Sequence, residues 1–174
     1  DGLAGNGLNT VANCALPGFG VVFGGPTGLQ IGEARTGRWR QMDSRSSDMR
    51  YDNVSALYCD AGNGFLILGY ATHGIDIYDA NDDEWRHMDR NSGLAANDVR
   101  RIAVVGDREQ IWVASDEGVT VSAGADSAFY DTGNSPLTAN RVGALAADAD
   151  GAVWLGGEGA LYRVQNEDWT VYTA

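Results

Sequence analysis

The feature that most constrains this chain is an internal repeat, which three separate sets of residues mark at one period. The apolar residues that open each copy are spaced 46, 45 and 43 residues apart: Leu8, Val54, Val99 and Val142. A glycine before a small or apolar residue recurs as Gly28, Gly74, Gly118 and Gly159. An aromatic residue recurs as Trp39, Trp85, Phe129 and Trp169. Since independent anchors keep one period, we interpret the chain as four copies of one structural unit.

Each copy divides into four short strands separated by turn signals. In the fourth copy, alternating or dense apolar segments occupy residues 142–147, 153–155, 161–164 and 169–172. Asp and Gly between them, as in residues 148–151, tolerate the backbone of a tight hairpin. This pattern predicts an all-β fold in which each copy is a four-stranded antiparallel blade of a β-propeller. We expect one propeller segment with four blades, at approximately residues 1–44, 45–90, 91–133 and 134–174.

A single blade cannot bury both faces of its sheet, so the blades must stack. Trp112 and Trp154 take equal positions in the second strand, where Val22 and Ile67 stand in the other copies. We expect these side chains to fill the gaps between blades. The copies are whole blades in phase, so the ends lack the shared-blade closure of many propellers. We therefore expect part of a larger ring, and a mature or partial chain.

The fourth copy resembles the two-component regulator propeller repeat. The residues that carry the resemblance are Asn140, Val142, Asp148-x-Asp150-Gly151-x-x-Trp154-Leu155-Gly156, Leu161-Tyr162-Arg163 and Trp169-x-x-Tyr172. The third copy keeps part of this pattern, and the first two lack the second-strand Trp. The resemblance implies an extracytoplasmic sensor part of a bacterial signalling protein or a surface protein, with rings that often have seven blades. Nothing in the chain resembles a kinase, a receiver or a DNA-binding module.

Charge narrows the set of partners. The formal net charge is −12, with 24 acidic residues against 12 basic ones. An acidic surface repels phosphate backbones and anionic lipids, so we expect neither nucleic acid nor direct membrane insertion. No apolar run is long enough to cross a bilayer. We expect a protein partner or small ligand, together with further blades from the same or another chain.

Propeller geometry indicates where a binding site would lie. Loops from strand four to the next strand one share a face with the loops between strands two and three, and loops on a rigid scaffold often carry function. We expect a binding surface around the channel mouth on this face, with Tyr70, His73, Asp116, Glu117 and Glu158. Ordinary solvated loop residues are the alternative reading of these five.

The sequence offers little catalytic or metal-binding chemistry. The two histidines, His73 and His87, lack metal-ligand spacing, so we expect no metal and no cofactor. Residues 148–151 resemble the start of a calcium loop, but Gly159 stands where its twelfth residue should be a Glu. A hairpin turn is the better interpretation.

The two cysteines, Cys14 and Cys59, lie at the ends of first strands in adjacent blades. A disulfide between the blades would form if the protein is exported. Two buried free thiols that act as small apolar side chains are the alternative.

Three functions remain, in this order of preference. The first is a non-catalytic binding module, an extracytoplasmic sensor-type or surface propeller that presents its loops to a ligand or protein. The second is a structural subunit of a surface or membrane-associated assembly. The third is an enzyme similar to streptogramin lyases, built from comparable repeats, in which His73 would act. We therefore expect no enzymatic activity and an extracytoplasmic location.

Overall fold

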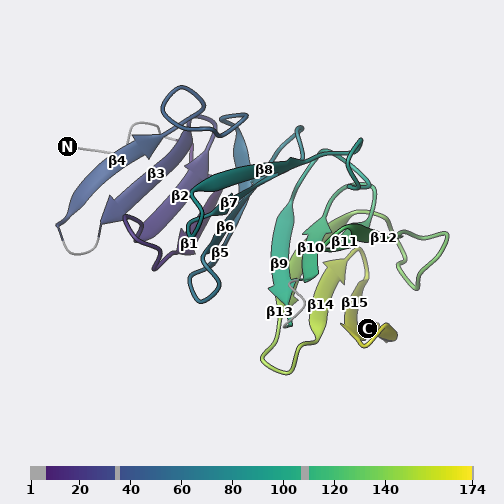
Figure 1. The fold of residues 1–174 in the computed structure, drawn as a ribbon. Coiled ribbons are helices and arrows are strands. Elements are labelled where there is room, and N and C mark those ends of the chain that lie inside the picture. Colours follow the sequence, from purple (N-terminus) through teal and green to yellow (C-terminus); the bar gives the residue numbers. More distant parts are fainter. Residues whose placement is uncertain (1–6, 34–35, 107–109, 174) are drawn as a thin grey trace. The chain divides into compact units, whose positions relative to one another are not determined.

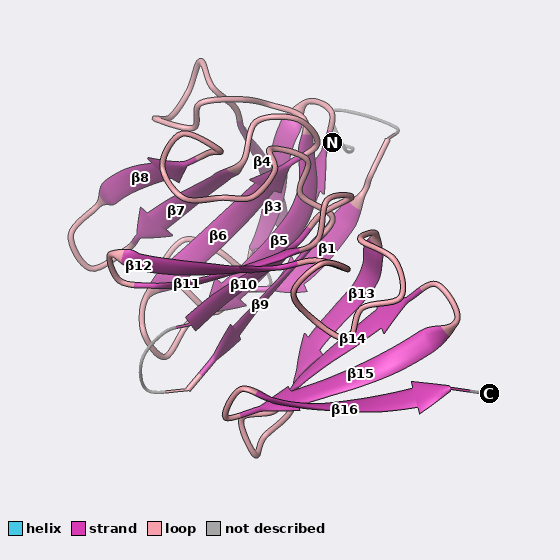
Figure 2. Cartoon of the chain, turned by 90° about the vertical axis from the view of Figure 1, so that its right-hand side faces the viewer, coloured by secondary structure: helices cyan, strands magenta, loops and turns pink. Residues whose placement is uncertain are grey.

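A computed structural model describes residues 7–33, 36–106 and 110–173, and these residues contain sixteen strands and no helix (Figures 1 and 2). The first sheet contains β1 (Thr10–Asn13), β2 (Val21–Gly25), β3 (Gly28–Glu33) and β4 (Arg38–Met42). The second contains β5 (Val54–Asp60), β6 (Phe65–Tyr70), β7 (Ile75–Asp79) and β8 (Glu84–Met88). The third contains β9 (Arg101–Val105), β10 (Gln110–Ala114), β11 (Val119–Ala123) and β12 (Asp126–Tyr130). The fourth contains β13 (Val142–Ala147), β14 (Val153–Gly157), β15 (Ala160–Gln165) and β16 (Asp168–Thr173).

Every sheet follows the order of its strands in the sequence, and the predicted four-stranded antiparallel sheets are confirmed. Each sheet lies inside one of the four expected blade ranges. The chain forms two compact units, Asp1–His87 (unit 1) and Met88–Ala174 (unit 2), and each unit contains two sheets.

In unit 1, the β1–β4 sheet packs against the β5–β8 sheet, and β1 lies beside β5. Alternate residues of β2 and β3 point into this core, with Val22 opposite Ile31. From the other sheet, Leu66 and Leu68 enter the same core and are fully buried. Burying each such side chain contributes about 1.5–3 kcal/mol, so the contact between the sheets stabilises both.

Unit 2 repeats this arrangement with β9 beside β13. Trp112 on β10 is buried among Val153, Leu155 and Tyr162 of the next sheet, so it fills the gap between the two sheets. Trp154 occupies the equal position on β14: it lies opposite Ala146, as Trp112 lies opposite Ala103. Trp154 is therefore on the face of β13–β16 that is turned away from β9–β12.

Backbone contacts explain the glycine anchor of the repeat. Gly28 begins β3 and Gly118 immediately precedes β11, with φ angles of +92° and +135°, a region that residues with a side chain rarely adopt. A Cβ added at Gly118 would lie 2.3 Å from the carbonyl oxygen of Tyr130, and one at Gly28 would lie 2.4 Å from that of Met42. Only glycine therefore allows the last residue of the fourth strand to lie so close to the backbone at the start of the third strand.

Hydrogen bonds explain why an Asn or Asp stands two residues before the apolar anchors Val54, Val99 and Val142. The backbone N–H of Ser44 donates to the Asp52 carboxylate at 2.8 Å, and the N–H of Arg90 donates to the Asn97 amide oxygen at 2.7 Å. Thr132 donates to Asn140 in the same way, at 2.9 Å. In these three copies, the polar residue two positions before Val54, Val99 and Val142 thus closes the long loop that precedes it, which fixes the loop on the sheet.

Candidate functional site

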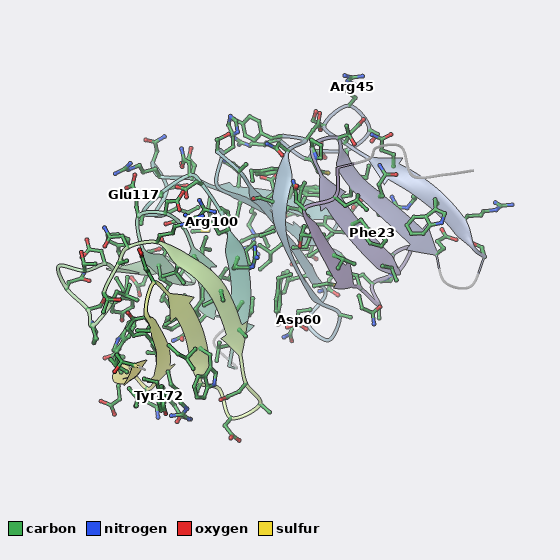
Figure 3. All side chains as sticks on the ribbon, turned by 180° about the vertical axis from the view of Figure 1, so that it is seen from behind. Phe23, Arg45, Asp60, Arg100, Glu117 and Tyr172 are labelled. Carbon is green, nitrogen blue, oxygen red and sulfur yellow. A yellow bond between two sulfur atoms is a disulfide. The ribbon has the colours of Figure 1, made fainter. Side chains whose placement is uncertain are left out.

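The loop end of unit 1 is built by residues 43–53, which connect β4 to β5. The carbonyl oxygen of Asp52 accepts a hydrogen bond from the N–H of Gly28, and that of Asn53 accepts one from the N–H of Ala71. The long loop is thus bonded to the β2–β3 and β6–β7 loops, as expected for loops that share one end of a blade. Figure 3 shows Arg45 of this loop and Asp60 of the β5–β6 turn at opposite ends of unit 1.

A buried hydrogen-bond network centred on Asp76 lies beneath this loop. The Tyr70 hydroxyl donates to Oδ2 of Asp76 at 2.5 Å, and Nδ1 of His87 lies 2.7 Å from Oδ1. The backbone N–H of Arg50, in the loop, donates to Oδ2 at 2.9 Å. Asp76 is only 1% exposed, so these bonds replace the water that a carboxylate needs.

The same position in unit 2 carries a neutral residue. Thr120 stands two residues after Gly118, as Asp76 stands two residues after Gly74, and its hydroxyl accepts a bond from the N–H of Ala95 at 2.9 Å. Holding the loop therefore requires an acceptor but no charge. The carboxylate of Asp76 has the additional effect of orienting Tyr70 and His87.

Two aromatic rings lie over this network. Tyr51 and His73 stack with ring centroids 3.7 Å apart and an interplanar angle of 25°. The edge-to-face contact of Tyr51 with Tyr70, at 5.6 Å, fixes the stack on the buried ring below. Tyr51 is 36% exposed and His73 is exposed, so the pair offers a rigid planar surface to solvent.

A cavity of about 380 Å³ opens beside the network. Its lining includes Arg50, Asp76, Trp85 and His87, and the side chain of His87 is 9% exposed. A carboxylate that holds Nδ1 of an imidazole fixes the orientation of the ring and its tautomer. Burial and the hydrogen bond to Asp76 raise the pKa of Tyr70 far above its usual range, so this residue stays a neutral donor.

At the loop end of unit 2, acidic side chains are paired with arginines. Nε of Arg100 donates to Oδ1 of Asp116 at 2.6 Å, and its second terminal nitrogen donates to Oδ2. Nε of Arg141 lies 3.4 Å from Asp116, and Arg90 pairs with Glu117 at 3.3 Å. Hydrogen bonds from Arg100 hold the pKa of Asp116 below its ordinary value. Figure 3 shows Arg100 and Glu117 close to each other at this end.

The structure thus locates the five residues predicted as a binding surface, and one expectation is corrected. Tyr70 is fully buried, because it ends β6 and points at Asp76, so it cannot touch a ligand at the surface. His73 is exposed in unit 1, and Asp116, Glu117 and Glu158 are exposed in unit 2. The carbonyl oxygen of Glu158 accepts a bond from Thr138 at 2.8 Å.

The predicted binding surface leaves out Asp76 and His87, and it does not single out Tyr51 within its loop. The sequence carries no signal for the burial of Asp76, because its alternation with Ile75 and Ile77 is typical of a strand that turns its polar side chain to solvent. Among the described residues, no group of three or more potential ligands is arranged to hold a metal ion.

Cys14 and Cys59 are joined by a disulfide with a Cα–Cα distance of 5.4 Å. Cys14 follows β1 and Cys59 lies on β5, so the bond links the two sheets of unit 1. No helix in the described ranges has the length and hydropathy to span a bilayer.

Comparison with known proteins supports the fold. Residues 136–159 match the family described as the two-component regulator propeller. No curated protein matches the chain in sequence.

Solved structures share the architecture at low sequence identity. The extracellular domain of BT4673 from B. thetaiotaomicron, assigned as a one component system, has a TM-score of 0.77 at 14% identity, over 99% of this chain and 25% of that one. A catalytically inactive virginiamycin B lyase from Staphylococcus aureus, with quinupristin, has a TM-score of 0.73 at 12% identity, over 99% and 58%. PorZ, a surface component of the type-IX secretion system of Porphyromonas gingivalis, has a TM-score of 0.68 at 19% identity, over 98% and 23%. The chain spans about a quarter of the length of the first of these, and the shared fold is a β-propeller.

Proposed function

We propose that this chain is a non-catalytic binding module: a four-bladed segment of a larger extracytoplasmic propeller that presents its loop ends to a small ligand or a protein. The observation that carries the proposal is the exposed Tyr51–His73 stack, supported from below by the buried Tyr70–Asp76–His87 network. A planar surface held rigid before binding loses little entropy when a ligand covers it. It therefore favours planar apolar groups.

The ionisable groups of the loop ends support binding over catalysis. Asp76 is engaged with His87 and Tyr70, and Nδ1 of His73 lies 2.8 Å from the Thr72 hydroxyl. In unit 2, Asp116 and Glu117 are each paired with an arginine. Groups held in such fixed pairs are suited to maintaining the shape of a binding surface, because they are not free to act as acids or bases.

Two observations support an extracytoplasmic location. A disulfide that links two sheets persists in an oxidising compartment and is rare in the cytosol. The similar propeller of BT4673 is an extracellular domain.

The test is an NMR titration of the isotope-labelled chain with a panel of planar ring compounds: the free aromatic amino acids and the nucleosides. We expect at least one compound to shift the signals of Tyr51 and His73. The double variant Tyr51→Ser/His73→Ser should lose this response, and Trp39→Ser, on an exposed sheet face, should keep it. A panel without any response at the stack would contradict the proposal.

A structural role is a second candidate, because one sheet face in each unit is apolar and exposed. In unit 2, Trp154, Leu161 and Tyr172 share the face of β13–β16 that is turned away from β9–β12. The equal face of β9–β12 carries Trp112 and is covered by the next sheet. By the same packing, we propose that another sheet of this repeat, from a longer chain or a second copy, covers the face with Trp154.

Unit 1 has a corresponding exposed face on β1–β4. Val11, Val21 and Trp39 are 59%, 37% and 44% exposed, and the ring of Phe23 lies 5.7 Å from that of Trp39. This face is opposite to the one that packs on β5–β8.

A lyase that uses His73 is the third candidate. This candidate rests on the fold shared with virginiamycin B lyase. In this chain, however, the carboxylate of Asp76 bonds to His87 and not to His73. Incubation with quinupristin tests it: we expect the compound to be recovered intact. Turnover that is lost in His73→Ala would replace the binding proposal with this one.

A further inference from the structure

Unit 2 contains a second, larger cavity at the opposite end from its loops. It has a volume of about 600 Å³, within the range of about 300–1,000 Å³ that small-molecule sites occupy. Its walls come from both sheets, with Trp112 and Tyr130 on one side and Val153 and Val164 on the other. Residues of the β11–β12, β13–β14 and β15–β16 turns form the rim, so this cavity is separate from the loop-end surface proposed above.

One wall of the cavity holds a buried donor that lacks an acceptor. Trp112 is 5% exposed, and within the described part of the chain its indole N–H has no hydrogen-bond partner. An unpaired buried donor costs about 1–3 kcal/mol, so such a group calls for an explanation.

The repeat itself shows what is missing. In the next sheet, the indole N–H of Trp154 donates to Oδ2 of Asp148 at 2.9 Å. Asp148 is the first residue of the β13–β14 turn, and Gly106 is the first residue of the corresponding β9–β10 turn. Gly106 has no side chain, so this position supplies no acceptor for Trp112 as Asp148 does for Trp154.

The rim of the cavity is acidic. Asp126, Asp150 and Glu167 line it and are exposed, and none of its described lining residues is basic. Within the described ranges these three carboxylates form no ion pair. Glu167 and Asn166 have φ angles of +70° and +51°, which belong to the tight turn between β15 and β16.

We propose that this cavity of unit 2 binds a small organic cation that has an apolar ring and a hydrogen-bond acceptor. The acceptor takes the indole N–H of Trp112, and the ring packs on Trp112 and Tyr130, whose own rings lie 6.3 Å apart. The cationic group lies among Asp126, Asp150 and Glu167 at the rim. Carboxylates and aromatic faces both attract a cation, and they repel an anion of the same shape.

Tyramine is a suitable probe, because it combines an ammonium group, a ring and a phenolic oxygen. Its control is 4-hydroxyphenylacetate, which has the same ring and oxygen but a carboxylate. The chain has five Trp, so the isotope-labelled protein gives five indole N–H signals, and Trp112→Phe identifies one of them. We expect tyramine to shift the Trp112 signal saturably, with a dissociation constant in the millimolar range or below. We expect 4-hydroxyphenylacetate to leave this signal in place.

Charge variants complete the test. Asp126→Asn/Glu167→Gln should weaken tyramine binding about three- to tenfold, since each exposed charge pair contributes modestly. Asp82→Asn, an exposed carboxylate in unit 1, should leave the affinity unchanged. A Trp112 signal that tyramine does not move in the folded chain, or that both compounds move equally, would overturn the proposal. So would equal tyramine affinity of the chain and the double variant.

Discussion

The hydroxyl of Tyr70 donates to the carboxylate of Asp76 at 2.5 Å, in the interior of unit 1. The bond joins the end of β6 to β7, and through His87 and Arg50 it extends to β8 and the loop above. The exposed surface of Tyr51 and His73 therefore rests on a polar network and not on an apolar core alone.

This network should contribute measurably to stability. Tyr70→Phe keeps the ring but removes the O–H, and a hydrogen bond to a charged group contributes about 1.5–3 kcal/mol. We expect the free energy of unfolding of unit 1 to fall by that amount, measured with urea. Tyr162→Phe is the matched variant in unit 2, where the Tyr162 hydroxyl accepts a hydrogen bond from the neutral N–H of Thr138. We expect this variant to lower the free energy of unfolding by only about 0.5–1.5 kcal/mol. Equal losses in both variants would show that the charge of Asp76 is irrelevant.

Removing the disulfide should destabilise unit 1. The bond closes a loop with a sequence separation of 45 residues, and restricting the unfolded chain in this way contributes about 3–4 kcal/mol. Cys14→Ala/Cys59→Ala should therefore unfold at a lower denaturant concentration than the oxidised chain. A reductant should destabilise the oxidised chain and have no effect on the double variant. An effect of reductant on the variant would point to some other cause.

Acid should weaken unit 2 through Asp148. The indole N–H of Trp154, with the backbone N–H of Ala152, lowers the pKa of Asp148 in the folded chain. A lowered carboxyl pKa adds stability above the unfolded value of about 3.9, and this stability is lost as the pH falls through the folded pKa. Asp148→Asn should therefore flatten the loss of stability below about pH 4.

The measurement for this prediction is the urea midpoint of unit 2 between neutral and strongly acidic pH. Asp150→Asn, at an exposed neighbour in the same turn, should keep the profile of the unmodified chain. Identical profiles for Asp148→Asn and the unmodified chain would contradict the assignment.

The exposed face of β13–β16 should make the isolated chain self-associate or bind hydrophobic dyes. Leu161→Glu/Tyr172→Ser places a charge and a hydroxyl on this face and should reduce both effects in light scattering and dye fluorescence. Val171→Ser is the control, because Val171 is 41% exposed on the same strand but on the opposite face. A control that acts as strongly as the double variant would exclude a specific docking face.

Much of the fold could be predicted from the sequence, because each copy of the repeat must meet the same steric and hydrogen-bonding requirements. Gly118 must be glycine to avoid the Tyr130 carbonyl, and Asn140 must accept a bond to close its loop, so both recur at one period. The candidate site could not be read in this way. Tyr70 is the last residue of the apolar strand β6, and only the position of Asp76 in the fold decides that the Tyr70 ring turns inward. The stack of Tyr51 on His73 joins loops 22 residues apart, and no local pattern encodes it.

The most direct test of the account follows the planar ring panel and the protein together in one NMR experiment. The account predicts that at least one compound shifts Tyr51 and His73 and remains chemically unchanged. It also predicts that Tyr51→Ser/His73→Ser abolishes the shift while the fold is kept. Conversion of a bound compound into a product, or a shift that survives the double variant, would contradict a non-catalytic binding surface at this stack.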